Sequence, residues 1–496
     1  MRRKNGLEIL IKSLNKGELR QFTLHSNIYS SKKVYLKIFK KIQRGELIDN
    51  NLSQQKMYLY NSILESLVGK IKINTPESKI FYHINCADFL FRKQIPTQAY
   101  SHIKKALKVS KKYELFGYHI QLIEKEKQIR LYLDTKKERS SFEINIEEIL
   151  LIKLQQKLQE KRKIYNFILD YKKKYGYLDK LSFSELNKKV NESESLAEGG
   201  GNLSIRINYY HHFSKSILFW MQKKHESAFK HTKLLSKLNK NVLSPSEYLN
   251  GILEHTTSCI CLGKFKEVLQ LLKHVRYEYN LGTFGNYNNI ILKIFYYCSN
   301  YETMSYVFLG EQDSLKQKII EINKGIKCWE GKIPLEMKFV LASVLKLAYI
   351  ALGELDKAKK EIFFILNEKN TTIRIDAYED SLMSNLIIIF EQGDVSYLES
   401  FSFKTITYFK SHKNKGAKHV KINRNISKAF YDYSIYKLTK KEFLFLYQKL
   451  IEKEMIKVTF SELYYPYLIW VYAQINNTTY IKTAEKMYKN KLLYID

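Results

Sequence analysis

The sequence predicts an all-α protein, built as an irregular α-solenoid of helix-turn-helix hairpins with a small N-terminal helical region. Its 496 residues include only 5 prolines and 19 glycines, and long helices need far fewer turn residues than sandwiches or barrels. Residues 349–365 read as an apolar helix that ends at Gly353 and, after two residues, is followed by a second amphipathic helix. Similar segments recur along the chain, which indicates stacked hairpins.

Residues 1–75 are expected to form short helices, the first with Leu7, Leu10, Ile11 and Leu14 on one face. Residues 76–190 are expected to hold helical hairpins and long helices. Pro96 suits the first turn of a helix, and residues 144–175 read as one or two long helices.

Residues 191–204 read as a flexible linker, because three consecutive glycines stand beside serine and acidic residues that have nothing to bury. A long loop inside one continuous array fits the same composition equally well. Residues 205–496 are expected to form the clearest part of the repeat array.

The repeats align on the second helix of each hairpin, with core positions at offsets 0, 3, 7 and 10. The two clearest copies are Leu355, Ala358, Ile362, Ile365 and Phe265, Val268, Leu272, Val275, each preceded two residues earlier by a glycine. Weaker copies are Pro96, Ala99, Ile103, Ala106 and His225, Ala228, Thr232, Leu235. A fifth begins at Val395 after Gly393 but has Ser402 and Thr405 at its later apolar positions.

This pattern resembles the tetratricopeptide-repeat superfamily. Ala87, Ala99 and Ala106 match small positions of one unit, Ala228 and Ala358 match the small residue that opens a second helix, and Gly263 and Gly353 match the turn. Lys346 and Thr256 depart from it, because they stand where the first helix should carry a small residue. The resemblance implies a concave groove that binds peptides or helices of partner proteins, and it implies no chemistry.

The net charge of +33 favours binding to a polyanion such as nucleic acid. Lysine, asparagine, isoleucine and tyrosine are abundant together, however, so AT-rich codon usage explains the charge as well. Residues 7–12 are too short and charged for a secretory apolar segment. Residues 339–352 are the longest apolar run and carry Lys346. We therefore expect a cytoplasmic protein without membrane insertion.

The candidate metal ligands read more simply as core or surface residues. Cys259 and Cys261 on one helix, with His255 one turn before and Cys298 downstream, do not form a four-ligand zinc pattern. His211, His212, His225 and His231 are interpreted as solvated or groove-lining. No phosphate loop, nucleophile elbow or paired-carboxylate motif occurs, so we expect no cofactor, no metal and no enzymatic activity.

A basic run without acidic residues occupies residues 400–431. It fits a loop that contacts phosphates with aromatics beside it, or a solvated connection between helices. The candidate polyanion contacts are Lys410, Lys413, Lys415, Lys418, Lys421, Arg424 and Lys428.

The expected function is a non-enzymatic scaffold or adaptor that captures a segment of a protein or peptide partner on the concave face. Helical position suggests these contact residues: Tyr209, His212, Lys215, Tyr248, His255, Tyr287 and Lys346. The alternative is a nucleic-acid-associated regulator that touches phosphates through the Lys410–Lys428 loop or through basic N-terminal helices. The N-terminal candidates are Arg2, Arg3, Lys32, Lys33, Lys40 and Lys41.

Overall fold

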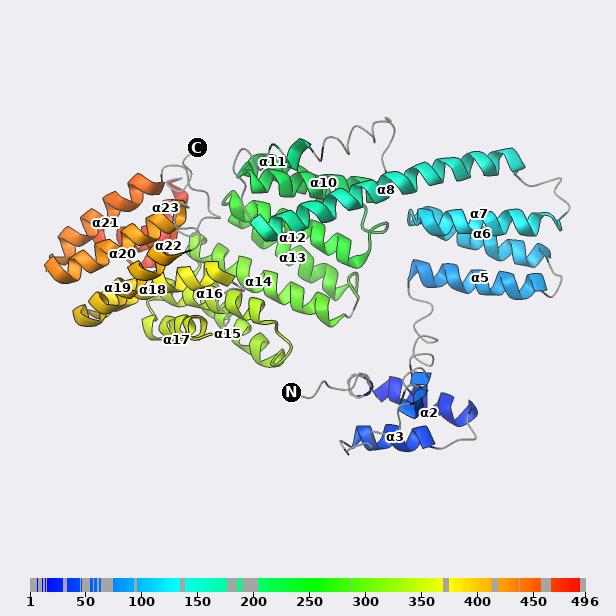
Figure 1. The fold of residues 1–496 in the computed structure, drawn as a ribbon, viewed down its shortest axis with the longest axis horizontal. Helices are drawn as coiled ribbons and strands as arrows, with labels where there is room; N and C mark the ends of the chain where they lie inside the picture. Colours follow the sequence, from blue (N-terminus) through cyan, green and yellow to red (C-terminus); the bar gives the residue numbers. More distant parts are fainter. Residues whose placement is uncertain are drawn as a thin grey trace. The chain divides into compact units, whose positions relative to one another are not determined.

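The computed structural model describes residues 76–490 apart from 93–95, 134–138, 176–183, 185, 189, 191–203, 286, 369–373, 413–417, 437 and 456–464. Before residue 76 it describes 7, 11, 14, 16–29, 34–44, 46, 54–56, 58–59, 62–63 and 75. Regular secondary structure within these ranges is helical, which confirms the all-α prediction (Figure 1). No helix of the described residues is long and apolar enough to cross a membrane. The predicted linker lies outside them except for Ser204, which caps a helix.

The chain divides into two compact units, Met1–Gln159 and Glu160–Asp496. The first contains α2 (Lys16–Tyr29), α3 (Val34–Gln43), α5 (Pro76–Arg92), α6 (Pro96–Lys112), α7 (Phe116–Arg130) and the start of α8 (Ser141–Tyr175). The division falls inside α8, a single helix that covers the whole of residues 144–175, for which one or two long helices were predicted. Leu7 and Ile11 are buried in one small cluster with Phe22 of α2 and Phe39 of α3.

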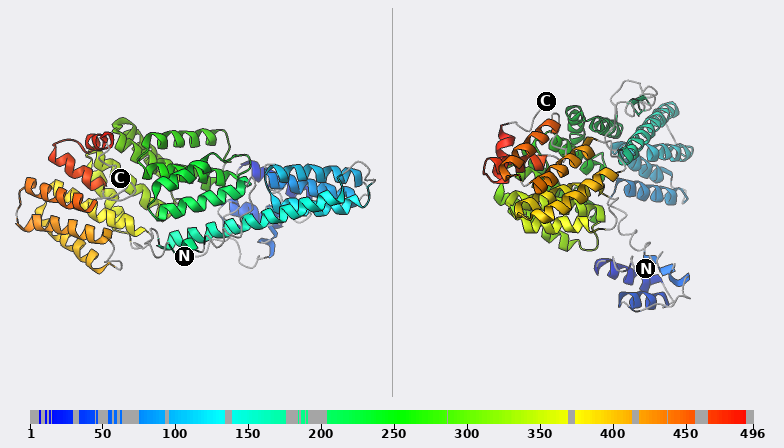
Figure 2. Two further views of the ribbon diagram at one scale, coloured as in Figure 1. Left: turned by 90° about the horizontal axis from the view of Figure 1, so that it is seen from above. Right: turned by 60° about the vertical axis from the view of Figure 1, so that its left-hand side comes forward.

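The second unit holds the remaining helices, which follow one another with short connections (Figures 1 and 2). They are α10 (Ile205–Met221), α11 (His225–Ser236), α12 (Pro245–Cys261), α13 (Phe265–Asn280), α14 (Asn288–Leu309), α15 (Gln312–Cys328), α16 (Leu335–Leu352), α17 (Leu355–Leu366), α18 (Ile375–Gln392), α19 (Val395–Ser411), α20 (Lys418–Tyr436), α21 (Lys440–Met455), α22 (Tyr465–Ile475) and α23 (Tyr480–Lys489).

The predicted hairpin joints are confirmed. Gly263, Gly353 and Gly393 have positive φ angles of 63°, 77° and 72°, a conformation that a residue with a Cβ adopts only at a cost. Beyond Gly353, the Glu354 N–H donates to the Tyr349 carbonyl at 2.8 Å and so satisfies one of the last carbonyls of α16.

The second helices begin where the offsets place them, at Pro96, His225, Phe265, Leu355 and Val395. Most of their core positions are buried, and the first position of the fifth copy, Val395, is exposed. Ser402 and Thr405 of that copy are buried too. Each hydroxyl donates to a backbone carbonyl four residues earlier, from Thr405 to Phe401 at 2.8 Å, so a polar side chain is tolerated there.

The structure adds one repeat copy that was not predicted from the sequence. Gly310 has φ +74° and precedes α15, where Leu315, Ile319 and Ile322 are buried at the same offsets. A polar first residue, Gln312, hides this copy in the sequence.

Two groups of three helices correspond to each other as a longer internal repeat. Helices α5, α6 and α7 begin at Pro76, Pro96 and Phe116, and α10, α11 and α12 begin at Ile205, His225 and Pro245, so each start is displaced by 129 residues. One side-chain contact repeats with it. The Nδ1 atoms of His83 and His102 lie 3.1 Å apart, as do those of His212 and His231.

The first helices of successive hairpins in the second unit contact one another, α12 with α14, α14 with α16, α16 with α18 and α18 with α20. The C-terminal helix α23 contacts α14 and α16. Beside it, Trp470 of α22 packs against Phe390, Phe430 and Tyr447 of α18, α20 and α21, with ring centroids 5.5–6.3 Å apart. These aromatic rings join the last helices to the earlier hairpins.

Candidate functional site

Four of the predicted partner contacts lie in the core. Tyr209, Tyr248, His255 and Lys346 are between 2% and 7% exposed, so a partner segment cannot lie directly against them, and their assignment as groove contacts is corrected. His212 and Lys215 are half-buried, and Tyr287 is exposed at the N-cap of α14.

The buried candidates have partners inside the fold. The Lys346 ammonium pairs with Asp380 of the next hairpin, and the Tyr467 hydroxyl donates to Asp380 Oδ1 at 2.7 Å. The Tyr248 hydroxyl lies 3.1 Å from His274 Nε2. The repeat pattern expects a small residue at position 346. A lysine is accommodated there because the Asp380 carboxylate, 34 residues later, neutralises it.

The interpretation of the histidines as solvated or groove-lining is wrong for His225, which is buried, and agrees with the half-buried position of His212. The His212 ring lies against His231, and burial, together with the charges of His211 and His231, lowers the pKa of His212 to about 4. His212 is therefore neutral near pH 7, and one imidazole of the pair donates to the other.

The basic run is mainly helical, so the prediction of a loop over Lys410–Lys428 is corrected. Lys410 lies in the last turn of α19, and Lys418, Lys421, Arg424 and Lys428 belong to α20. Lys413 and Lys415 lie outside the described residues. The helix forms because Val420, Ile422, Ile426 and Phe430 are buried at helical spacing.

A half-buried polar and aromatic surface runs along α12 and α14. We call it the α12–α14 stripe, and it consists of Asn250, Glu254, Thr257, Lys293, Tyr297 and Tyr301. Helical spacing places each three on one face of its helix. Lys293 Nζ donates to Asn250 Oδ1 at 2.5 Å, and the Thr257 and Tyr301 hydroxyls lie 2.8 Å apart.

Burial sets the charge state of this stripe. It lowers the pKa of Lys293, against a smaller opposing effect of Glu254, and it raises the pKa of Tyr297 above its ordinary value. The phenol is therefore a neutral hydrogen-bond donor beside an ammonium group. The stripe offers hydrogen bonds and ring faces without a nucleophile held by a base, which suits binding better than catalysis.

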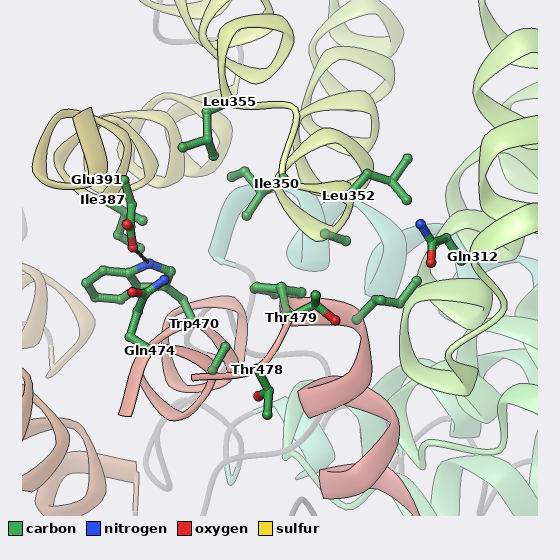
Figure 3. Close-up of a pocket in the computed structure, with 15 residues that line it drawn as sticks. Gln312, Ile350, Leu352, Leu355, Ile387, Glu391, Trp470, Gln474, Thr478 and Thr479 are labelled. Atoms are coloured by element: carbon green, nitrogen blue, oxygen red, sulfur yellow. Dashed lines mark hydrogen bonds between the residues drawn. The ribbon is translucent and has the colours of Figure 1, made fainter. Parts of the chain in front are cut away.

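A cavity of about 250 Å³ lies beside the Gly353 joint (Figure 3). Its lining includes Ile350, Leu355, Ile387 and Trp470, and Trp470 Nε1 donates to Glu391 Oε1 at 2.7 Å. Small-molecule sites usually enclose about 300–1,000 Å³. The cavity is thus slightly smaller than most small-molecule sites.

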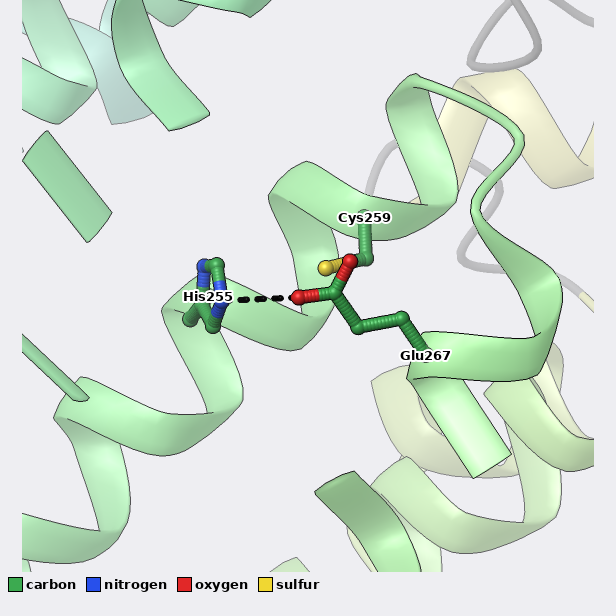
Figure 4. Close-up of side chains that lie close together, drawn as sticks. All are labelled: His255, Cys259 and Glu267. Carbon is green, nitrogen blue, oxygen red and sulfur yellow. Dashed lines mark ion pairs between the residues drawn. The ribbon is translucent and has the colours of Figure 1, made fainter. Parts of the chain in front are cut away.

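One side-chain cluster of the described residues has the composition of a metal site: His255, Cys259 and Glu267 (Figure 4). His255 and Cys259 lie one turn apart on α12, and Glu267 reaches them from α13, across the Gly263 joint. Their ligand atoms all lie within 4.8 Å of one another. His255 and Cys259 were candidates from the sequence. Glu267 was not, because it comes close to them only when α12 and α13 pack as a hairpin.

No family model matches the chain, and no curated protein matches it. The resemblance to tetratricopeptide repeats therefore stays a prediction.

Proposed function

We propose that the protein is a non-enzymatic, cytoplasmic scaffold that binds a segment of a partner protein along the α12–α14 stripe, within a solenoid of tetratricopeptide-like hairpins. The observation that carries the proposal is the stripe itself. Asn250, Lys293 and Tyr297 are polar or aromatic, half-buried and held by their neighbours, so they can bind a partner without a large loss of side-chain entropy.

The packing of the helices supports this position for the site. The first helices of successive hairpins contact one another from α12 to α20. A side chain between two such helices is therefore held in place by two neighbouring hairpins. Tyr297 and Tyr301 add large, rigid aromatic surface with a polar end, which is common where proteins bind each other.

The chemistry of the stripe indicates what a partner segment contains. Lys293 Nζ carries three N–H groups, and one donates to Asn250. A carboxylate or carbonyl of the partner can accept from the ammonium, and the acidic group would also stabilise a charge that burial disfavours. We therefore propose peptides that combine an acidic side chain with apolar ones.

A phage-displayed random peptide library panned on the full chain tests the proposal. Peptides of this composition should be enriched on the wild type and on Lys273→Ala/Tyr277→Ala, and lost on Lys293→Ala/Tyr297→Ala. The control pair has the same i, i+4 spacing on α13, where both side chains are exposed. No enrichment, or enrichment that the stripe variant retains, would contradict the assignment.

A second candidate function is contact with nucleic acid through α20. Lys421, Arg424 and Lys428 are spaced by three and four residues on one helix face, and both lysines are exposed. Three phosphate contacts give a salt slope of roughly −2.7 in log K against log salt. Filter binding should show such a slope, and Lys421→Gln/Lys428→Gln should reduce it by about 2. The absence of binding at low salt would remove this candidate.

A further inference from the structure

We infer that His255, Cys259 and Glu267 form a binding site for a transition-metal ion, with zinc as the expected occupant. The three side chains supply one nitrogen, one sulfur and one oxygen ligand, a set that suits Zn²⁺ among the common divalent ions. Calcium and magnesium would select oxygen ligands alone. The site is separate from the α12–α14 stripe and does not depend on the proposed function.

The hydrogen bonds around His255 fix which ring nitrogen faces the cluster. The Thr232 hydroxyl donates its single hydrogen to the Phe229 carbonyl at 3.0 Å, so Thr232 Oγ1 can only accept from His255 Nδ1, 3.1 Å away. The neutral ring therefore keeps its lone pair on Nε2. Metal-binding histidines are commonly held in this way by an acceptor at the other nitrogen.

The lone pair of Nε2 points to a second acceptor. Glu267 Oε1 lies 3.5 Å from Nε2. Two acceptors at this distance need a cation between them, either a proton or a metal ion. Zinc bonds of about 2.0–2.2 Å to nitrogen and oxygen place such ligands about 3.3–3.5 Å apart in a tetrahedron, which matches the observed separation.

The third ligand favours a transition metal over a hard ion. Cys259 is fully buried and its sulfur lies within 4.8 Å of the other two ligand atoms, so a bound zinc ion would be held by the thiolate after release of the thiol proton. Glu267 is 38% exposed at the edge of the cluster and leaves a path for the ion. The ammonium groups of Lys233 and Lys264 also act on His255; they oppose a cation, while the thiolate and the carboxylate together balance its charge of two.

Zinc in proteins is usually four-coordinate. An ion held by these three side chains would therefore take a water molecule as its fourth ligand. The Gly263 joint lies between Cys259 and Glu267 in the chain, so a bound ion would tie α12 to α13 and stabilise that hairpin.

Metal titration of the full chain tests the inference. After treatment with a chelator, the wild type should bind one equivalent of Zn²⁺ in competition with a chromophoric chelator, and Co²⁺ should give a near-ultraviolet thiolate absorption band. Cys259→Ser should abolish the band and weaken zinc binding at least 100-fold. Cys261→Ser, which changes another buried cysteine of α12, should preserve both, and Thr232→Val should weaken binding about 10- to 100-fold.

Stoichiometric binding that Cys259→Ser retains, equal loss in Cys261→Ser, or no binding by the wild type would overturn the inference. Should Cys259→Ser fail to fold, Glu267→Gln provides the test at a partly exposed position. It should keep the helical circular dichroism of the wild type and lose at least tenfold in zinc affinity, and unchanged affinity would contradict the assignment.

Discussion

Replacement of Lys346 by alanine should lower the free energy of unfolding of the second unit by about 3–5 kcal/mol. Lys346 is 3% exposed and the side chain of Asp380 is 14% exposed, so neither charge can return to water when its partner is removed. Attraction between unit charges about 4 Å apart amounts to about 4 kcal/mol at an effective dielectric constant of 20. Asp380 would keep the hydrogen bond from Tyr467, which holds the cost within this range.

The double variant Lys346→Met/Asp380→Asn distinguishes the cost of leaving one buried charge unpaired from the contribution of the ion pair itself. It removes both ions while keeping similar volumes, so it should unfold within about 1.5 kcal/mol of the wild type. With the single variants Lys346→Met and Asp380→Asn as the other corners of the cycle, the coupling between the two sites should exceed about 2 kcal/mol.

Urea unfolding followed by tryptophan fluorescence measures these energies. Trp220, Trp329 and Trp470 all lie in the second unit, so the signal reports that unit alone. A cost below about 1 kcal/mol for Lys346→Ala, or a double variant as unstable as the sum of the two single ones, would refute the buried ion pair.

The remaining predictions concern glycines and pH. Gly353→Ala should cost about 1–2 kcal/mol in urea unfolding, because φ is +77° while no atom lies within 4 Å of an added Cβ; a neutral effect would contradict the left-handed joint. Gly325→Ala should cost at least as much despite its better helix propensity, since the added Cβ would lie 2.1 Å from Phe295 Cε2, and a gain in stability would show that this contact is not close. The pKa of His212 is about 4 in the fold against 6.5 when unfolded, so the unfolded state binds more protons and stability should fall between pH 6.5 and 4. The loss of unfolding free energy over this pH range should be about 1–2 kcal/mol after allowance for partial exposure, and it should be largely absent in His212→Gln. If the unfolding free energy of that variant falls with pH as it does in the wild type, the effect belongs to other groups.

The sequence predicted the joints and second helices well because their signals are local. Gly353 and the spacing of Ala358, Ile362 and Ile365 depend only on one helix end and one helix face. Residues 418–428 show the limit of composition as a guide. The lack of acidic residues suggests a loop, but the apolar spacing of Ile422, Ile426 and Phe430 indicates a helix, and the burial of these side chains decides the local structure.

The candidate sites were harder to predict because their residues come from separate helices. Asp380 neutralises Lys346 from 34 residues away, and nothing near Lys346 in the sequence indicates that partner. Glu267 joins His255 and Cys259 only after the Gly263 joint folds α13 back on α12. Lys293 and Asn250 likewise meet across two hairpins, so the α12–α14 stripe has no local pattern.

Photo-crosslinking tests the central claim, that a partner segment lies on the α12–α14 stripe, most directly. Benzoylphenylalanine replaces Tyr297 on the stripe or Tyr277 on α13, and each protein is irradiated with a peptide selected on the wild type. We predict a crosslink from position 297 and none from position 277. A crosslink from 277 alone, or equal yields from both positions, would contradict the account.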